Sequence, residues 1–212
     1  MGNNIKAILF DLDGTLRDTK DIIIDAYMHA VEVHNGRRPS LQELQPHIHH
    51  HSEVYKALSA HIAYEPWLET YRTKLSSAWM EAPFFEHAEQ VLQELKMAGY
   101  RLAVVTSAEY ERTIEYLSYR NIDQYFEVVV AMREGFRPKP EPDMMLDAMR
   151  QLGCTPQETI TIGDMITDVQ AAHAAGIQIV GITHGFASRR ELEDAGADYL
   201  IDRLADFPDI LA

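Results

Sequence analysis

The sequence predicts an α/β fold in which a mostly parallel sheet is covered by helices on both faces. Three observations lead to this prediction. Short runs rich in β-branched residues recur along the chain, stretches with helical periodicity separate them, and one long early stretch shows helical periodicity alone. Strands buried on both faces alternate with helices where a parallel sheet lies between two helical layers. The early stretch without strands predicts an all-helical insertion.

The first strand is predicted over residues 5–10, an apolar run that stops at Asp11. Later strands are predicted at 101–106, 128–131, 159–163, 178–182 and 199–201. Helices are predicted between them at 88–97, 110–119, 142–152 and 168–175, and three of these are closed by glycines. This alternation predicts a Rossmann-like arrangement.

The insertion predicts the domain organisation. Helical periodicity is present at 22–34, 53–61 and 67–80. We therefore expect a discontinuous core of residues 1–16 and 86–212, with a helical cap at 17–85. Open α/β sheets bind ligands at the carboxyl ends of their strands, so a cap placed there would cover such a site.

Composition excludes several classes of function. Of 212 residues, 46% are hydrophobic and 25% charged, which argues against disorder. The formal net charge of −14 makes nucleic acid and anionic membranes poor partners. The single cysteine, Cys154, cannot form an intramolecular disulfide, and the apolar run near the start is too short for a signal peptide or a membrane span. We therefore expect a cytoplasmic protein.

The most informative segment follows the first predicted strand and reads Asp11-Leu12-Asp13-Gly14-Thr15-Leu16. Gly14 allows the chain to turn, so both carboxylates can enter one pocket. Crowded carboxylates repel each other, and a bound divalent cation relieves that repulsion. The alternative is a strand ending in a glycine turn, with the aspartates capping backbone amides.

Three further polar segments follow predicted strands. They are Thr106-Ser107, Lys139 within Arg137-Pro138-Lys139-Pro140-Glu141-Pro142, and Gly163-Asp164-Met165-Ile166-Thr167-Asp168. A hydroxyl and a neighbouring amide can hold phosphate oxygens, and an ammonium can balance carboxylate and phosphate charge. Each segment also has a plainer interpretation, as a helix N-cap or as a solvated surface lysine.

In this order, the four segments resemble the motifs of the haloacid dehalogenase-like (HAD) hydrolase superfamily. The resemblance is closest to its phosphoglycolate phosphatase and β-phosphoglucomutase branch with a helical cap, and it covers nearly the whole chain. The sequence departs from the commonest pattern at Met165, where family members usually carry Ser or Thr. One polar contact of the last motif would then be absent, with consequences for metal affinity or substrate orientation.

The resemblance implies a role for each acidic residue. Asp11 would be the nucleophile, and Asp13 would protonate the leaving oxygen and then activate water. Mg²⁺ would be held by Asp11, the Asp13 backbone carbonyl and Asp164, with Asp168 supporting the site from behind.

The resemblance also implies a phosphate-binding set and a reaction. Thr106, Ser107 and Lys139 would bind the transferring group, Lys139 also stabilising its charge. Asp13 is absent from dehalogenases of the superfamily, so its presence favours phosphoryl transfer. The expected activity is Mg²⁺-dependent hydrolysis of small-molecule phosphomonoesters through an aspartyl-phosphate. A phosphosugar mutase of the β-phosphoglucomutase type remains open, as does a catalytically silent phospho-ligand-binding protein, which only Met165 favours.

Two features of the predicted cap have no settled role. Arg17 follows the first motif, where it could bind a second anionic group of the substrate or pair with a surface carboxylate at the hinge. His47, His49, His50 and His51 are nearly contiguous. A zinc site is conceivable, but an exposed loop is favoured because contiguous histidines rarely converge on one ion. The sequence does not indicate the oligomeric state or the physiological substrate.

Overall fold

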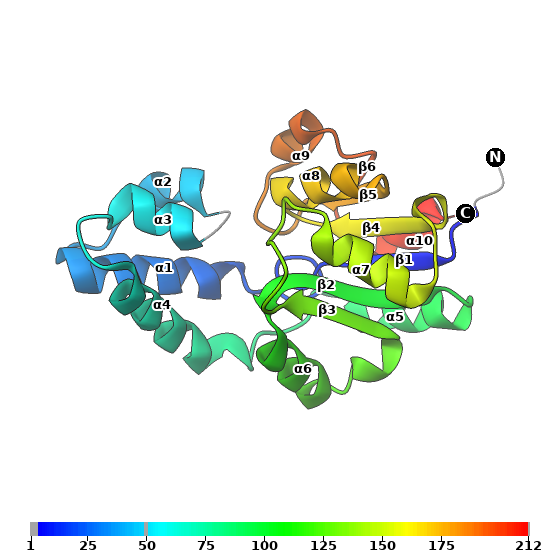
Figure 1. Cartoon of the computed structure of the whole chain (residues 1–212), viewed down its shortest axis with the longest axis horizontal. Helices are drawn as coiled ribbons and strands as arrows, with labels where there is room; N and C mark the ends of the chain where they lie inside the picture. Colours follow the sequence, from blue (N-terminus) through cyan, green and yellow to red (C-terminus); the bar gives the residue numbers. More distant parts are fainter. Residues whose placement is uncertain (1–3, 49–50, 212) are drawn as a thin grey trace. The chain divides into compact units, whose positions relative to one another are not determined.

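A computed structural model describes residues 4–48 and 51–211 and divides the chain into two compact units (Figure 1). The first unit consists of Met1–Asp18 and Phe84–Ala212, and the second is Thr19–Pro83. The predicted junctions, after residue 16 and before residue 86, differ from these by two residues each. The role of the second unit as a cap stays a prediction.

The first unit contains a six-stranded sheet in the order β3-β2-β1-β4-β5-β6. Its strands are β1 (Ala7–Phe10), β2 (Arg101–Glu109), β3 (Val128–Met132), β4 (Thr159–Gly163), β5 (Gln178–Ile182) and β6 (Tyr199–Ile201). Every neighbouring pair is parallel. The predicted parallel α/β fold is therefore confirmed, and all carboxyl ends of the strands lie at one edge.

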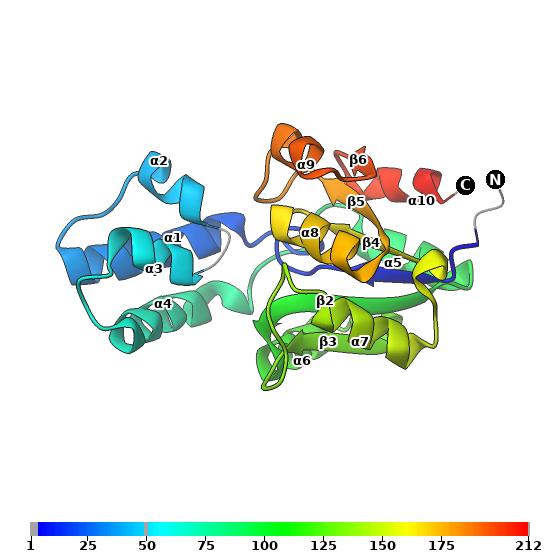
Figure 2. The same ribbon diagram turned by 45° about the horizontal axis from the view of Figure 1, so that its top comes forward.

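Helices cover both faces of this sheet (Figure 2). They are α5 (Ala88–Met97), α6 (Tyr110–Tyr119), α7 (Asp143–Leu152), α8 (Ile166–Ala175), α9 (Arg189–Ala195) and α10 (Phe207–Ile210). Successive strand residues point to opposite faces. Accordingly, Leu9 belongs to the core cluster that contains residues of α7 and α8, whereas the ring of Phe10 contacts Phe207 of α10, with centroids 5.9 Å apart. Strand β1 is thus buried on both sides.

The described residues of the second unit form helices joined by loops, with no strand. The unit contains α1 (Lys20–Asn35), α2 (Leu41–Leu44), a 3₁₀ turn at Gln45–His47, α3 (His51–Leu58) and α4 (Tyr64–Trp79). Helices α1 and α4 pack through aromatic rings. The ring of Tyr27 stacks on Tyr71 with centroids 4.7 Å apart, and Trp67 lies beside both rings with no exposed surface. Aromatic rings supply much of the buried apolar area in this small unit.

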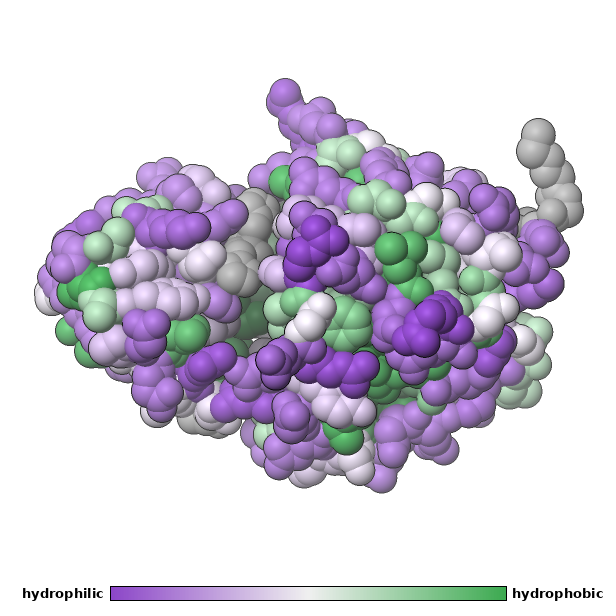
Figure 3. Space-filling view, viewed as in Figure 1, coloured by the Kyte–Doolittle hydropathy of each residue, from purple (hydrophilic) through white to green (hydrophobic). Residues whose placement is uncertain are grey.

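The molecular surface agrees with the charged composition. On the face drawn in Figure 3, hydrophilic residues predominate and hydrophobic residues occur in small scattered areas. Within residues 4–48 and 51–211, no helix combines the length and the apolar character needed to cross a bilayer.

Candidate active site

The predicted acidic residues meet at the carboxyl edge of the sheet, where β1 and β4 are neighbours. Phe10 is in register with Ile162, and the Asp11 N–H donates to the Ile162 carbonyl at 3.0 Å. Asp11 directly follows β1, and Asp164 directly follows β4. The parallel pairing therefore delivers two carboxylates that are far apart in the sequence to one place.

Lys139 connects two of the carboxylates at this edge. Its Nζ donates to Asp11 Oδ1 and to Asp168 Oδ1, both at 2.6 Å. The three side chains are at most 11% exposed. Lys139 comes from the proline-rich segment before α7, and Asp168 from the first turn of α8, where it also accepts the Met165 N–H at 3.0 Å. One ammonium thus bridges two buried carboxylates.

Asp164 is enclosed by backbone and by a hydroxyl. Its Oδ1 accepts from Thr15 Oγ1 at 2.9 Å, and its Oδ2 accepts from the Phe186 N–H at 2.7 Å. A Cβ at Gly14 would lie 2.3 Å from Asp164 Oδ2, and one at Gly185 would lie 2.1 Å from it. Only glycine allows the chain to approach the carboxylate so closely, and Gly14 also has φ +85°. The sequence did not reveal the contributions of Phe186 and Gly185, because they come from the loop after β5.

Burial dominates the electrostatics of this cluster. It raises the pKa of the Asp11 carboxyl to about 7, and the Lys139 ammonium offsets this shift only in part. Burial, followed by the charges of Asp11 and Asp168, raises the pKa of Asp164 well above its usual value. Burial alone would lower the pKa of Lys139, but the carboxylates of Asp11 and Asp168 outweigh it and raise this pKa. With all three carboxyl groups ionised, one ammonium cannot neutralise the cluster, and the raised pKa values of Asp11 and Asp164 reflect this cost.

The donor set fits a hard divalent cation. Asp11, Asp164 and Asp168 each have a carboxylate oxygen within 4.8 Å of the others. Carboxylate oxygens are ligands that Mg²⁺ prefers, and its charge would offset the excess that burial makes costly. Asp11 Oδ1 and Asp168 Oδ1 both accept from the Lys139 ammonium, whereas the two oxygens of Asp164 accept from neutral groups, the Thr15 hydroxyl and the Phe186 amide. Asp13 belongs to the predicted ligand set through its backbone carbonyl, and its side chain lies outside this carboxylate group.

Asp13 and Arg17 form a separate pair. Arg17 Nε donates to Asp13 Oδ1 at 2.7 Å, and the Arg17 guanidinium lies over the ring of Tyr116. The Arg17 side chain is fully buried, whereas that of Asp13 is 16% exposed. The roles of Arg17 in substrate binding or in a surface pair stay predictions.

The residues predicted to bind phosphate, Thr106 through its hydroxyl and Ser107 through its amide, lie in the last part of the neighbouring strand β2. Thr106 is buried, and its Oγ1 accepts the Ala108 N–H at 3.1 Å, whereas Ser107 is exposed. Because β2 pairs with β1, these residues belong to the same edge of the sheet as Asp11. Their role in holding phosphate stays a prediction.

The structure describes only two of the four clustered histidines, His47 and His51. His49 and His50 lie outside the described residues. His47 ends a 3₁₀ turn, and His51 Nδ1 shares a hydrogen bond of 2.6 Å with the Tyr64 hydroxyl in the second unit. The zinc and exposed-loop interpretations therefore both stay predictions.

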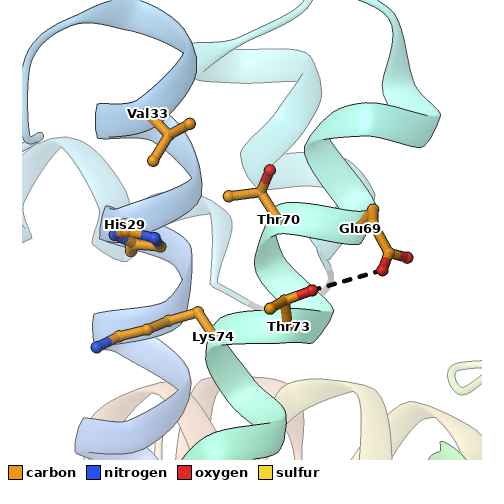
Figure 4. A pocket seen from close by; sticks show the side chains of 6 residues that line it. All are labelled: His29, Val33, Glu69, Thr70, Thr73 and Lys74. Carbon is orange, nitrogen blue, oxygen red and sulfur yellow. Dashed lines mark hydrogen bonds between the residues drawn. The ribbon is translucent and has the colours of Figure 1, made fainter.

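A shallow cavity in the second unit lies between α1 and α4 (Figure 4). It is lined by His29, Val33, Glu69, Thr70, Thr73 and Lys74. Thr73 Oγ1 donates to Glu69 at 3.4 Å, and Lys74 pairs with Asp25 at 2.9 Å. Its charged groups pair locally, and it contains none of the predicted site residues.

Comparison with known proteins gives consistent results. The family model described as haloacid dehalogenase-like hydrolase matches residues 8–182. The pyrophosphatase PpaX of Bacillus velezensis is 31% identical over 204 residues, covering 95% of this chain and 94% of that protein. A crystal structure of a predicted phosphatase from Clostridium acetobutylicum superposes with a TM-score of 0.85 at 25% identity, covering 98% of each chain.

A further crystal structure, of CbbY from Rhodobacter sphaeroides in complex with xylulose-(1,5)bisphosphate, has a TM-score of 0.79 and 27% identity. It covers 95% of this chain and 96% of that one. The family match spans most of the chain and includes all four motifs. The chain therefore belongs to the haloacid dehalogenase-like hydrolases and is an enzyme of their phosphatase type.

Proposed function

We propose that this enzyme is a Mg²⁺-dependent phosphatase that hydrolyses small phosphorylated molecules through an aspartyl-phosphate on Asp11. The observation that carries the proposal is the convergence of Asp11, Asp164, Asp168 and Lys139 at one edge of the sheet. An exposed acidic cluster would need no counter-charge, whereas this cluster is buried around an ammonium. A buried ammonium among carboxylates is suited to a site that binds a phosphoryl group and stabilises its negative charge.

Asp11 is the proposed nucleophile. One of its carboxylate oxygens attacks phosphorus in line, while the bond from phosphorus to the leaving oxygen breaks. Burial raises the pKa of Asp11, which works against the reactive carboxylate form. The hydrogen bond from Lys139 Nζ favours the ionised form and so keeps Asp11 competent to attack.

Asp13 is the proposed acid and base. In the first step its carboxyl gives a proton to the leaving oxygen, and in the second it accepts a proton from the water that hydrolyses the aspartyl-phosphate. This exchange needs a side chain that reaches solvent, and Asp13 is the more exposed partner of its pair with Arg17.

Asp11, the Asp13 backbone carbonyl and Asp164 would hold Mg²⁺, which would supply charge stabilisation for the phosphoryl oxygens. Lys139 contributes a second positive charge, held between the carboxylates of Asp11 and Asp168. Thr106 and the Ser107 amide would bind the remaining phosphoryl oxygens. Asp168 holds Lys139 and the Met165 amide, so it fixes the start of α8 against the site.

Inorganic pyrophosphate is the first substrate to test, because the relative from Bacillus velezensis is a pyrophosphatase at 31% identity. Phosphoglycolate, sugar phosphates and nucleotides complete the panel. Release of free phosphate distinguishes a phosphatase from a mutase, which returns the phosphoryl group to another hydroxyl. The predicted cytoplasmic location fits such small metabolites.

The deciding variant is Asp11→Asn, which keeps the size of the side chain and removes the nucleophile. We expect kcat for Mg²⁺-dependent phosphate release to fall by at least about 10³-fold. Acid quenching during wild-type turnover should trap phosphate on the peptide that contains Asp11, and the variant should trap none.

The matched control is Asp194→Asn, at an exposed position of α9, and its kcat should be unchanged. Circular dichroism checks that both variants are folded. Retained turnover in Asp11→Asn would remove Asp11 as the nucleophile. A wild-type enzyme that releases phosphate from no member of the panel in Mg²⁺ would overturn the proposed activity.

A further inference from the structure

The Arg17 side chain contacts Asp13 but has no part of its own in the proposed mechanism. We infer that Arg17, seated on Tyr116, is a positioning residue that holds the carboxylate of Asp13 in place for proton transfer. This inference rests on the proposed function, because it concerns the residue proposed as acid and base. Its support comes from the backbone of the loop, the side-chain contact and the ring beneath it.

The backbone fixes the two residues relative to each other. The Leu16 and Arg17 N–H groups both donate to the Leu12 carbonyl at 3.0 Å, and the Gly14 N–H donates to the Arg17 carbonyl at 2.9 Å. These bonds close the segment from Leu12 to Arg17 into a tight turn around Gly14. These hydrogen bonds couple the backbone position of Arg17 to that of Asp13.

The side-chain contact is directional. Arg17 Nε donates to Asp13 Oδ1 at 2.7 Å, a short distance typical of a charge-assisted hydrogen bond. The bond occupies one oxygen of the carboxylate and thereby sets the rotation of the other, which is the atom proposed to carry the proton. Because the Arg17 side chain is fully buried, water competes little for this bond.

The aromatic platform explains why an arginine is needed. The guanidinium carbon lies 4.1 Å from the centroid of the Tyr116 ring. Phe84 meets that ring edge-on, with centroids 5.8 Å apart, and Tyr116 has no exposed surface. A planar guanidinium can stack on a ring and still donate from Nε, whereas a lysine ammonium offers charge without that geometry.

In this arrangement Arg17 aligns the general acid, whereas a substrate-binding arginine would contact the substrate itself. A residue that binds the substrate directly affects its affinity, whereas a residue that aligns the acid affects the chemical step. Proton donation to the leaving oxygen matters most when that oxygen is a poor leaving group. An alkyl phosphate therefore depends on a well-placed Asp13 more than p-nitrophenyl phosphate does.

The experiment compares these two substrates, using the best alkyl phosphate of the panel, in the full-length enzyme with Mg²⁺. Arg17→Met should lower kcat on the alkyl phosphate by about 30-fold and on p-nitrophenyl phosphate by less than about threefold. Arg17→Lys should also lower kcat more on the alkyl phosphate than on p-nitrophenyl phosphate, but both losses should be smaller than in Arg17→Met. Equal losses on the two substrates, or a change in KM alone, would overturn the inference. Should Arg17→Met fail to fold, Arg17→Lys decides by the same criterion.

A double-mutant cycle tests whether Arg17 acts through Asp13. In an Asp13→Asn background, adding Arg17→Met should change kcat on the alkyl phosphate by less than about twofold. Losses that multiply would show an independent action and overturn the inference. Arg120→Met is the matched control, because the Arg120 guanidinium also stacks in this aromatic group, 5.1 Å from the Phe84 ring centroid, and has no part in the proposed mechanism.

The outcomes separate the inference from the proposed function. If the wild-type enzyme hydrolyses neither substrate, the proposed function fails and the inference with it. If Asp13→Asn loses activity selectively on the alkyl phosphate while both Arg17 variants keep theirs, the proposed function stands and only the inference fails.

Discussion

The two units of the chain bury different kinds of side chain. The first unit buries five charged groups: Asp11, Arg17, Lys139, Asp164 and Asp168. In the described part of the second unit the buried polar side chains are Thr19 and Ser59, both neutral, and the core is built from aromatic rings. Desolvating a charge costs several kcal/mol before pairing recovers part of it, whereas burying an aromatic ring is favourable throughout. The first unit thus buries charge at a cost in stability, whereas the buried side chains in the described part of the second unit are apolar or neutral.

The largest effect on stability is expected from the aromatic core of the second unit. Trp67→Ala should lower the free energy of unfolding by about 4 kcal/mol, because it removes a fully buried ring that lies beside Tyr27 and Tyr71. Urea denaturation followed by circular dichroism measures this loss.

Leu41→Ala is the control within the same unit, since Leu41 is 49% exposed. It should cost well under about 1 kcal/mol. A small loss for Trp67→Ala would show that packing does not stabilise this unit, and the contrast between the units would disappear.

A smaller effect is expected from breaking the charge compensation in the first unit. Lys139→Met leaves Asp11 and Asp168 buried without their shared ammonium, and should cost about 3 kcal/mol at pH 8 in the absence of divalent cations. Lys56→Met, at an exposed position of α3, is the matched control and should cost less than about 0.5 kcal/mol.

The pH dependence of this loss has a definite sign. Burial raises the pKa of Asp11 from 3.8 to about 7 even with Lys139 present, and removing Lys139 raises it further. The folded state then holds a proton that the unfolded state has released, so stability falls as pH rises from about 4 through 7. The cost of Lys139→Met should therefore shrink at pH 5, measured as the urea midpoint. A cost that grows on acidification would contradict the assignment of Lys139 as the compensating charge.

The smallest effect concerns the cation. At about 100 times its Kd, Mg²⁺ should stabilise the wild-type protein by about 2.7 kcal/mol, seen as a rise in Tm. Asp164→Asn removes one proposed ligand carboxylate and should lose most of that rise. An equal rise in both proteins would exclude Asp164 as a ligand and weaken the link between buried charge and cation binding.

Much of the first unit could be predicted because its signals are local. Apolar runs of about five residues mark strands buried on both faces, and the strand at 199–201 is confirmed together with the longer ones. Once the strands are parallel, polar residues that follow them must share an edge. That rule was enough to bring Asp11 and Asp164 together from the sequence.

The contacts that complete the site depend on tertiary structure and left no comparable signal. The Phe186 N–H reaches Asp164 from the loop after β5, and the Thr15 hydroxyl reaches it from the first motif. For Arg17, contact with substrate or with a surface carboxylate stays a prediction, and its contacts with Asp13 and with a ring of α6 left no signal in the sequence. Such pairings follow from how loops pack, which residue type and spacing do not specify.

Three short helices, α2, α9 and α10, were missed for a different reason, which the first two illustrate. Helix α2 has four residues and α9 has seven, too few for an apolar period to repeat. The sequence nevertheless marks the start of α2 and of α9 with a capping box, in which Ser40 pairs with Glu43 and Ser188 pairs with Glu191. For helices of four to seven residues, a capping box is a better indicator than apolar periodicity.

The position of β1 in the sheet has a consequence for biosynthesis. This strand precedes one of its two neighbours, β4, by about 150 residues of the chain, and β4 is synthesised later. Until then the growing polypeptide cannot gather its repelling acids in one place. A nascent chain is therefore spared the crowding of negative charge until β4 has been made.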